Sequence, residues 1–471
     1  MVMENVNTKK LNKAKSTTRD MTKGGIYRHM LAFALPILGS QLFQQLYNTA
    51  DAFIVGRLLG TEALAAVSSS GPLIHLMISF LVGISMGAST TIARYFGAGD
   101  PDKVSKAIHT NLAFGLISSL ILTVFGVIFT PNILRWINTD PQVMPLATQY
   151  FRLYFAGIST IVMYNMTKGI MNAVGDSRRP LFYLIYSSVL NVVLDIVFIA
   201  VFNWGVWSAA LATVISQASA LVLCLFHVLK KGQIYSVYIR RIRIHKGIFG
   251  EIVRIGLPAG VANSVIGLAN VVVQSQINTF GMMAMAAYGA HSKIEGFVFL
   301  PVMSFNLAIS TFISQNLGAK EYERAKKGAR FGIILAMVIS QVIGVIVLLW
   351  AEQLVGLFDS NPEVIRLGAL QARTLARFYF LLSFSHAIAS VCRGAGKAFV
   401  PMLVMLGVWC LARLAYIYSI MHFVGDISYI YWAYPITWLI SSVIYLIYYL
   451  RSDWVHGFEH PKRKGLFSRG N

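Results

Sequence analysis

Charged residues are scarce in this chain of 471 residues, and acidic residues are the scarcest. Asp and Glu together number 19, Lys and Arg number 40, and charged residues make up 13% of the sequence. Because a soluble domain carries about 25% charged residues, this shortage excludes an ordinary soluble protein. With 56% hydrophobic residues, the chain has the composition of a protein that crosses a membrane several times.

Cysteine is also rare, and the sequence motifs of common enzymes are missing. Cys224, Cys392 and Cys410 lie in apolar segments, with neither metal-binding spacing nor a disulfide framework. No HExxH, GxSxG or phosphate-binding Gly-Lys-Ser/Thr motif occurs. The string from Gly97 to Asp100 matches the GxGD pattern of intramembrane proteases, but its second copy, from Gly318, has lost the Asp. We therefore expect a protein that is not an enzyme and has no cofactor.

Long apolar segments fill most of the chain, and twelve of them reach the roughly 18–20 residues needed to cross a bilayer. The first 30 residues are polar and basic, so we expect no cleaved signal peptide. The twelve expected spans are 31–56, 63–96, 107–130, 144–172, 180–203, 206–229, 249–279, 284–317, 328–350, 365–392, 401–424 and 427–450.

The basic residues are concentrated on alternate sides of these spans. If the N-terminus is cytoplasmic, most of the 40 lysines and arginines fall in cytoplasmic loops and tails, as the positive-inside rule requires. We expect a multi-pass protein of the cytoplasmic (plasma) membrane with both termini cytoplasmic. The net charge of +21 then favours contact with anionic lipid headgroups, a membrane-lipid partner, and not nucleic acid.

The sequence contains an internal repeat at an offset of 221 residues. The matching positions spread over some 150 residues, which indicates a duplicated gene. Six spans precede the repeat point, so both halves enter the membrane in the same direction. We predict an all-α polytopic membrane protein, with 12 transmembrane helices in two six-helix lobes related by a parallel internal repeat. Matched pairs include Gly60 with Gly281, Ser89 with Ser310, Gly97 with Gly318, Gly175 with Gly396, and Pro180 with Pro401.

The repeat also predicts how the chain is divided. We expect a cytoplasmic N-terminal tail at 1–30, an N-lobe at 31–229, a basic cytoplasmic linker at 230–247, a C-lobe at 248–450 and a cytoplasmic C-terminal tail at 451–471. We expect this linker to be a polar, unpaired joint, which would let the lobes rock.

Two prolines occupy matched positions in the first span of each lobe. Pro36 and Pro258 each remove one backbone hydrogen bond and weaken the helix locally. They would act either as hinges or as fixed kinks.

Two acids lie well inside the expected spans, where an ionisable group costs about 2.5–3.5 kcal/mol on insertion scales. Asp51, Asp195 and Thr213 all fall about 9–12 Å below the outer face at 1.5 Å per residue. Tyr47 and Asn191 lie one helical turn deeper on the same faces. Carboxylates, an amide and hydroxyls suit a coupling ion, H⁺ or Na⁺, and we expect no other metal. The alternative is a structural pairing of buried acids.

The second half lacks this constellation. At the repeat offset, Asp195 becomes Tyr416, Asn191 becomes Ala412 and Thr213 becomes Tyr434. A residue kept only for helix packing could appear in both halves, so its restriction to one half favours function.

The second half has two charged candidates of its own. Glu295 could contact substrate or ion, or could pair with Lys293 at the rim of span 8. Arg413 lies in the middle of span 11, where it could neutralise an acid or position a substrate. Alternatively, it could snorkel toward the interface or simply bond backbone carbonyls.

The order and spacing of several strings resemble the multidrug and toxic compound extrusion (MATE) family, over about residues 26–450. The strings are Leu35-Pro36, Tyr47-Asn48-Thr49-Ala50-Asp51, Asn191-Val192-Val193-Leu194-Asp195, Trp204-Gly205-Val206, Ala210-Leu211-Ala212-Thr213, and Ile294-Glu295-Gly296-Phe297 before Pro301.

The resemblance implies an antiporter that exports drugs or other small organic compounds against inward Na⁺ or H⁺. The prokaryotic branch places its cation site in the first lobe, at the positions of Asp51, Asn191, Asp195 and Thr213. Related lipid-linked oligosaccharide flippases share the architecture and are the alternative. A two-lobed chain can hold the whole pathway alone, so we expect a monomer to suffice.

Overall fold

The computed structural model describes residues 19–136 and 139–458, apart from the side chains of residues 61, 64 and 68–78. The outer parts of both expected tails, 1–18 and 459–471, lie outside the described residues. The described chain is helical throughout, without strands. The first half contains α2 (Ile26–Leu58), α3 (Thr61–Gly97), α4 (Pro101–Trp136), α5 (Met144–Ala156), α6 (Ile158–Ala173), α7 (Arg178–Asp195), the π-helix η1 (Ile196–Val201) and α8 (Trp207–Val228).

The second half repeats this order after the short 3-10 helix η2 (Ile239–Arg241). It contains α9 (Lys246–Asn278), α10 (Met282–Gly318), α11 (Tyr322–Leu349), α12 (Ala351–Gly356), α13 (Pro362–Ala376), α14 (Tyr379–Gly394), α15 (Phe399–Val404), the π-helix η3 (Met405–Ala412), α16 (Arg413–Phe423) and α17 (Ile427–Arg451).

Each of the twelve expected spans corresponds to a helix or to a broken helix, so the predicted fold class is confirmed. Within the described residues, eight helices are long and apolar enough to cross a membrane, or nine if the bent pair α13 and α14 is one span. The two helices of that pair meet at 53°. In the first half, α5 and α6 break at Gly157, the position matched by Phe378 between α13 and α14. Both copies of the repeat are therefore interrupted at the same point.

Two π-helical segments lie beside intramembrane charges. The α-helical part of span 5 ends at Asp195, and η1 begins at the next residue. In span 11 the order is reversed: η3 ends at Ala412 and the α-helix resumes at Arg413. π-helical turns are rare in proteins, and those that do occur are often at functional sites.

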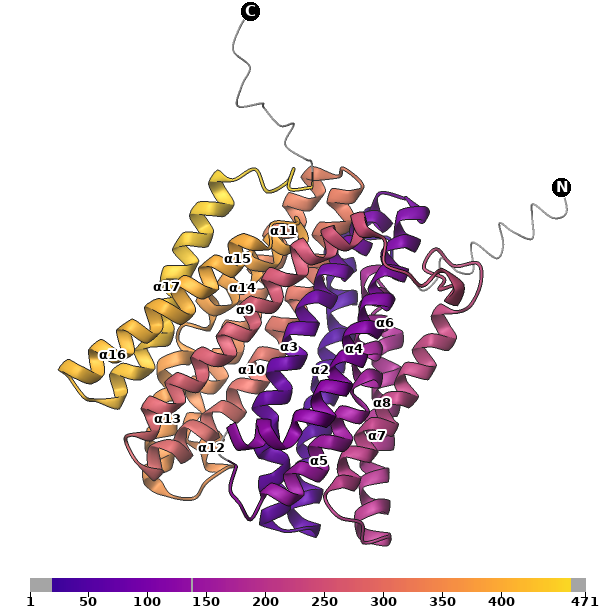
Figure 1. Ribbon diagram of the computed structural model, residues 1–471. Coiled ribbons are helices and arrows are strands. Elements are labelled where there is room, and N and C mark those ends of the chain that lie inside the picture. Colours follow the sequence, from indigo (N-terminus) through magenta and orange to yellow (C-terminus); the bar gives the residue numbers. More distant parts are fainter. Residues whose placement is uncertain (1–18, 137–138, 459–471) are drawn as a thin grey trace, which may run out of the picture.

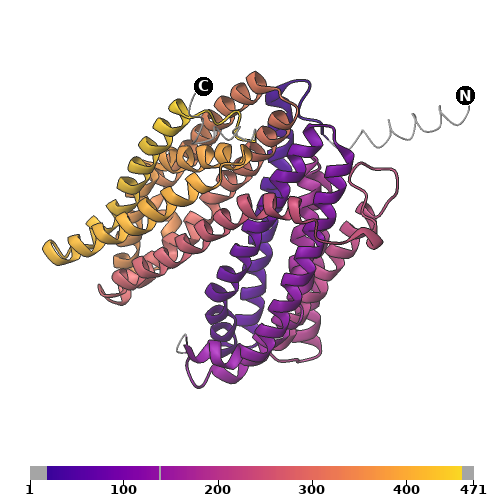
Figure 2. The same ribbon diagram turned by 45° about the horizontal axis from the view of Figure 1, so that its top comes forward.

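The helices form two groups that diverge toward one end of the molecule (Figure 2). Figure 1 shows α2 to α8 on one side and α9 to α17 on the other. Most core side chains of each group pack within that group. The start of α2 is an exception, because Met30, Phe33 and Ile37 belong to the core of the second group. Likewise Ile252, early in α9, packs on Ile84 and Ala88 of α3. Each lobe's first helix thus begins against the other lobe.

The two lobes approach most closely at one end of the molecule, which contains Met21 and the ends of α3 and α10 and which we call the closed end. Gly97 of α3 and Gly318 of α10 are repeat partners, and each faces the backbone of the other helix. A Cβ on Gly97 would lie 1.9 Å from the carbonyl oxygen of Gln315, and one on Gly318 would lie 1.9 Å from that of Arg94. Only glycine permits this approach. The retained Gly-Ala turn therefore marks the pseudo-twofold contact between the lobes.

Glycines and one ion pair extend this contact to α9. Cβ atoms on Gly83 and Gly87 of α3 would lie 2.3 Å and 2.5 Å from backbone atoms of α9. Nearby, Nη1 of Arg94 lies 3.3 Å from Oε2 of Glu251, and the hydroxyl of Tyr95 donates to the same oxygen at 2.7 Å. The closed end is held by main-chain proximity and by one cross-lobe ion pair.

The segment before α2 joins this end. Met21 is fully buried; its N–H donates to Oε1 of Gln315 at 3.0 Å, and its carbonyl accepts from Nε of Arg324 at 3.0 Å. Nε2 of Gln315 also donates to the carbonyl of Ala173 in the N-lobe at 2.9 Å. α2 begins at Ile26, so the last part of the expected tail is helical, and Met21 and Met30 within that tail are buried.

Candidate functional site

Two intramembrane carboxyl groups meet in the N-lobe. Asp51 comes from α2 and Asp195 from the last position of α7, and their carboxyl groups interact with each other. Asp195 is fully buried, whereas Asp51 remains partly exposed. Within the described chain, neither oxygen of Asp195 accepts a hydrogen bond, nor does Oδ1 of Asp51. The depth argument therefore identified two residues that the fold brings together.

The predicted amide and hydroxyl groups adjoin this pair. Asn191 lies one turn before Asp195 on α7 and is fully buried. Its Nδ2 donates to Oγ1 of Thr213 on α8 at 3.5 Å, the outer limit of a hydrogen bond. Its Oδ1 is buried and, in the described structure, without a donor.

Tyr47, the fifth predicted residue, lies near the pair. Its hydroxyl interacts with the side-chain amides of Gln217 and Gln44 and faces Asp51 and Asp195. Tyr150 of α5 also faces both acids and is buried. The sequence argument missed Gln217 and Tyr150. It could have found them, because Gln217 lies one turn beyond Thr213, and Tyr150 lies six residues into span 4, at the depth of the acids.

The resulting site contains more acceptors than donors. Asp51, Asp195 and Asn191 present buried oxygens without donors in the described chain, although buried polar atoms are normally paired. Two ionised carboxylates about 4 Å apart repel each other by roughly 4 kcal/mol at an effective dielectric constant of about 20. A proton or a small cation between the oxygens removes both the repulsion and the unpaired acceptors. The site chemistry therefore fits a monovalent cation.

The donor set is smaller than that of a resident metal centre. Among residues 19–136 and 139–458, no group of three or more His, Cys, Asp or Glu side chains could hold a metal ion. Two carboxylates with amide and hydroxyl oxygens suit a proton or Na⁺ better than a transition metal.

The C-lobe has a positively charged side chain at the positions where the N-lobe has its amide and acids. Arg413, on span 11, matches Val192, next to Asn191, and is 1% exposed. Its Nε and Nη2 donate to Oγ1 of Thr437 at 3.2 Å and 2.8 Å. Its guanidinium carbon lies 5.2 Å from the ring centre of Trp409 and 4.4 Å from that of Tyr434. Stacking and the hydroxyl fix this side chain, which does not snorkel.

Glu295 on α10 is partly exposed, and Arg413 is the charged group that acts on it. In the described structure neither residue belongs to an ion pair within 4.0 Å. The alternative of a Lys293–Glu295 pair is therefore not observed. Glu295 keeps its carboxylate available, with a buried cation behind it.

The two predicted hinge prolines lie inside unbroken helices. α2 continues through Pro36 and α9 through Pro258. Ser40 donates to the carbonyl of Pro36 at 3.0 Å, a contact that Ala262 cannot make at the matching position. α2 therefore has a side-chain hydrogen bond to the carbonyl of its proline, which α9 lacks.

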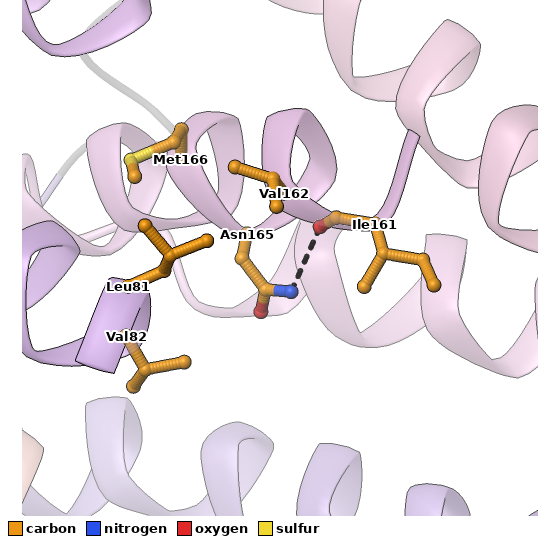
Figure 3. A pocket seen from close by; sticks show the side chains of 6 residues that line it. All are labelled: Leu81, Val82, Ile161, Val162, Asn165 and Met166. Atoms are coloured by element: carbon orange, nitrogen blue, oxygen red, sulfur yellow. Dashed lines mark hydrogen bonds between the residues drawn. The ribbon is translucent and has the colours of Figure 1, made fainter. Parts of the chain in front are cut away.

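A small hollow lies between α3 and α6 (Figure 3). It is lined by Leu81, Val82, Ile161, Val162, Asn165 and Met166. Asn165 donates its Nδ2 to the carbonyl of Ile161 at 2.9 Å (Figure 3). The lining is apolar apart from Asn165, whose Nδ2 is already used within its own helix.

Known proteins resemble this chain over most of its length. The family model MatE matches residues 36–197 and 258–418. The chain is 28% identical over 442 residues to "Probable multidrug resistance protein YoeA" of Bacillus subtilis, covering 92% of this chain and 95% of that protein. It is 27% identical to "Probable multidrug resistance protein YpnP" of the same organism, covering 83% and 88%. A solved "Outward-facing conformation of a multidrug resistance MATE family transporter" superposes with a TM-score of 0.86 at 23% identity, covering 93% of this chain and 98% of that one.

Proposed function

The chain belongs to the MatE family of membrane transport proteins, and on that premise we propose that it is a cation-coupled antiporter that exports small organic compounds. The coupling ion, H⁺ or Na⁺, binds between Asp51 and Asp195. The single observation that carries this proposal is the set of buried acceptor oxygens without donors on Asp51, Asp195 and Asn191. The two similar relatives described as probable multidrug resistance proteins support drugs as cargo.

We propose alternating access between the two lobes. The lobes correspond to residues 31–229 and 248–450, and the closed end faces the cytoplasm of a cell whose plasma membrane holds the protein. In the conformation described, the cation enters from the diverging end and neutralises the acids. Neutralisation removes the repulsion between them and favours the conformation in which their surroundings close. Substrate leaves outward as the ion enters, and Pro36 and Pro258 are positions where α2 and α9 can bend.

Asn191, Thr213 and Tyr47 position the ion. Thr213 offers a hydroxyl oxygen beside the amide of Asn191, and Tyr47 links the acids to Gln217 deeper in the lobe. These neutral oxygens replace part of the hydration shell of the ion. Tyr150 lies near the same two acids.

In the C-lobe we propose that Glu295 contacts a cationic or amphiphilic substrate. The positive charge of Arg413 acts on this carboxylate, and Arg413 is itself fixed by Thr437. Replacing Glu295 with Gln should raise the KM for a cationic substrate at least tenfold and leave the ion dependence unchanged. Transport of a cation with unaltered KM in that variant would remove Glu295 from the substrate pathway.

The test of the main proposal uses purified protein in liposomes and a fluorescent organic cation, with a Na⁺ gradient and a pH gradient imposed separately. We expect transport driven by one of the two gradients, and its loss in Asp51→Asn. A response to neither gradient, with several substrates tried, would overturn the antiporter and favour the lipid-linked flippase.

A further inference from the structure

The segment that joins the two lobes carries a dense, unneutralised positive charge. We call Lys230–Lys246 the basic linker. It contains no Asp or Glu, and its six basic side chains are all exposed: Lys230, Lys231, Arg240, Arg241, Arg243 and Lys246. In the described structure none of them is within 4.0 Å of a carboxylate. Arg241 stacks on Tyr238, and Arg243 contacts His245, so the contacts they make leave their charge unneutralised.

Other basic turns at the closed end differ in this respect. Lys103 and Lys106 lie 3.2 Å and 2.6 Å from carboxylate oxygens of Asp100 and Asp102. Lys326 lies 2.8 Å from Glu323. These lysines carry their own counterions within three or four residues, whereas the basic linker must find its counterions elsewhere.

Large apolar side chains alternate with the arginines. Ile239 is 70% exposed and Ile234 is 53% exposed, and Tyr238 and Ile244 are also exposed. Exposed isoleucines are unfavourable in water and serve no purpose on a surface that binds only soluble anions. Basic residues interleaved with exposed apolar ones are the pattern of a segment that lies in a membrane interface.

The backbone of the basic linker is fixed before any partner arrives. Tyr235 and Val237 are buried in the core of the N-lobe. The N–H of Tyr238 donates to Nε2 of His109 at 2.9 Å, and the N–H of His245 donates to Oγ1 of Thr110 at 3.2 Å. Our expectation of an unpaired joint is therefore not met: the basic linker is docked on the N-lobe. A docked surface loses little conformational freedom on binding.

The position of the basic linker identifies its partner. It begins two residues after α8 ends and finishes at the first residue of α9, and both helices are membrane spans. The basic linker lies at the closed end of the molecule (Figure 1). We propose that it is a docking surface for anionic phospholipid headgroups of the adjacent leaflet, with its arginines on the phosphates and its isoleucines among the upper acyl carbons.

The test reports where Ile239 lies. In protein whose cysteines at 224, 392 and 410 are replaced, Ile239→Cys is labelled with a fluorophore. The protein is placed in nanodiscs of phosphatidylcholine alone, or with about one third phosphatidylglycerol, both containing a lipid with a nitroxide near its headgroup. We expect at least about twofold stronger quenching in the anionic discs, reduced by about 0.5 M NaCl because salt screens the attraction.

Two triple variants distinguish an effect of the basic linker from an effect of the general surface charge. Arg240→Gln, Arg241→Gln and Arg243→Gln together should abolish the difference between the discs. The matched control, Lys103→Gln, Lys106→Gln and Lys326→Gln, removes the same charge at the same end and should retain it.

Equal quenching in neutral and anionic discs would overturn the proposal, and this comparison needs only the labelled protein with its arginines intact. A difference that survives the arginine substitutions would overturn it as well. Binding of an RNA of about 20 nucleotides in detergent, lost in the same triple variant, would assign the surface to nucleic acid instead.

Discussion

Asp195 is the residue whose surroundings are least like those of a structural acid. A structural carboxylate in the membrane would be held by Arg, Lys or backbone N–H groups, but both oxygens of Asp195 are buried without a donor in the described chain. An unsatisfied buried group costs about 1–3 kcal/mol. This unfavourable burial occurs at the junction of α7 and η1. Functional sites commonly lower the stability of a protein in this way.

Asp195→Asn should therefore separate stability from transport. The new amide can donate to the free oxygen of Asp51, so we expect the thermal midpoint to rise by about 1–3 °C, while gradient-driven transport is lost. Scanning fluorimetry in detergent and the liposome assay measure the two quantities.

The matched control for this substitution is Asp426→Asn. Asp426 caps α17 by accepting from the N–H of Ser428 at 2.8 Å, and Asn caps equally well. That variant should change neither quantity. A lower thermal midpoint with retained transport in Asp195→Asn would assign Asp195 a structural role.

At the scale of elements, glycine positions decide how closely helices meet. A Cβ at Gly318 would overlap the backbone of α3, while one at Gly289 of the same helix would meet nothing within 4 Å. Gly318→Ala should destabilise the closed end by about 1–3 kcal/mol, as overpacking does. Gly289→Ala should be neutral or slightly stabilising, because alanine favours helix.

Hydrogen exchange measures this effect. Amides near Arg94 and Gln315 should exchange at least about tenfold faster in Gly318→Ala than in Gly289→Ala, since about 1.4 kcal/mol corresponds to a factor of ten. Equal exchange in the two variants would show that the lobes do not meet through this contact.

The docking of the basic linker should depend on pH through His245. Burial, together with Arg243 and Lys106, lowers the pKa of this histidine, which also faces His109. A lowered pKa means that the docked state disfavours protonated His245. The docking contribution is therefore full above about pH 6.5, the usual histidine pKa, and is lost as the pH falls from there toward the folded pKa.

The amide of His245 reports this transition. It donates to Thr110, and its exchange should be protected at pH 7.5 and less protected at pH 5.5, after correction for the intrinsic rate. His245→Asn, which cannot titrate, should show the same protection at both values. Unchanged protection in the native chain would contradict docking through a neutral imidazole.

Hydropathy predicted the spans well because it is averaged over all residues of a span, and the repeat supported the same division in both halves. They could not predict the π segments beside Asp195 and Arg413 or the burial of Met21, because these depend on contacts between distant segments. For the site, depth along each helix was enough to select Asp51, Asn191, Asp195, Thr213 and Tyr47, and their role stays a prediction. Gln217 and Tyr150 were missed because the search began from acids and not from every polar residue at that depth.

At the scale of the whole molecule, the two repeats make equivalent contacts at the closed end but differ in their charged residues. Gly97 and Gly318 make the same contact in both directions, whereas the acids of the N-lobe have no counterpart in the C-lobe. A symmetric contact can serve as a pivot, and a one-sided acidic site lets a single lobe respond to the ion.

This division predicts opposite movements at the two ends. Leu58 and Thr279 are repeat partners at the ends of α2 and α9, and Asp102 and Glu323 are repeat partners at the starts of α4 and α11. All four are exposed, so each can be replaced with a spin-labelled cysteine without disturbing the core. If the lobes rock about the glycine contact, binding of the ion should shorten the Leu58–Thr279 distance and lengthen the Asp102–Glu323 distance.

Pulsed electron resonance in nanodiscs, with pH and Na⁺ varied separately, measures both distances. Asp195→Asn should abolish the response to the ion at both ends, because the site that senses it is gone. Control spin labels on Lys103 and Arg178, both in the N-lobe, should keep a constant separation under all conditions. A change of the same sign at both ends would exclude rocking, and a response that persists in Asp195→Asn would place the coupling ion outside the N-lobe.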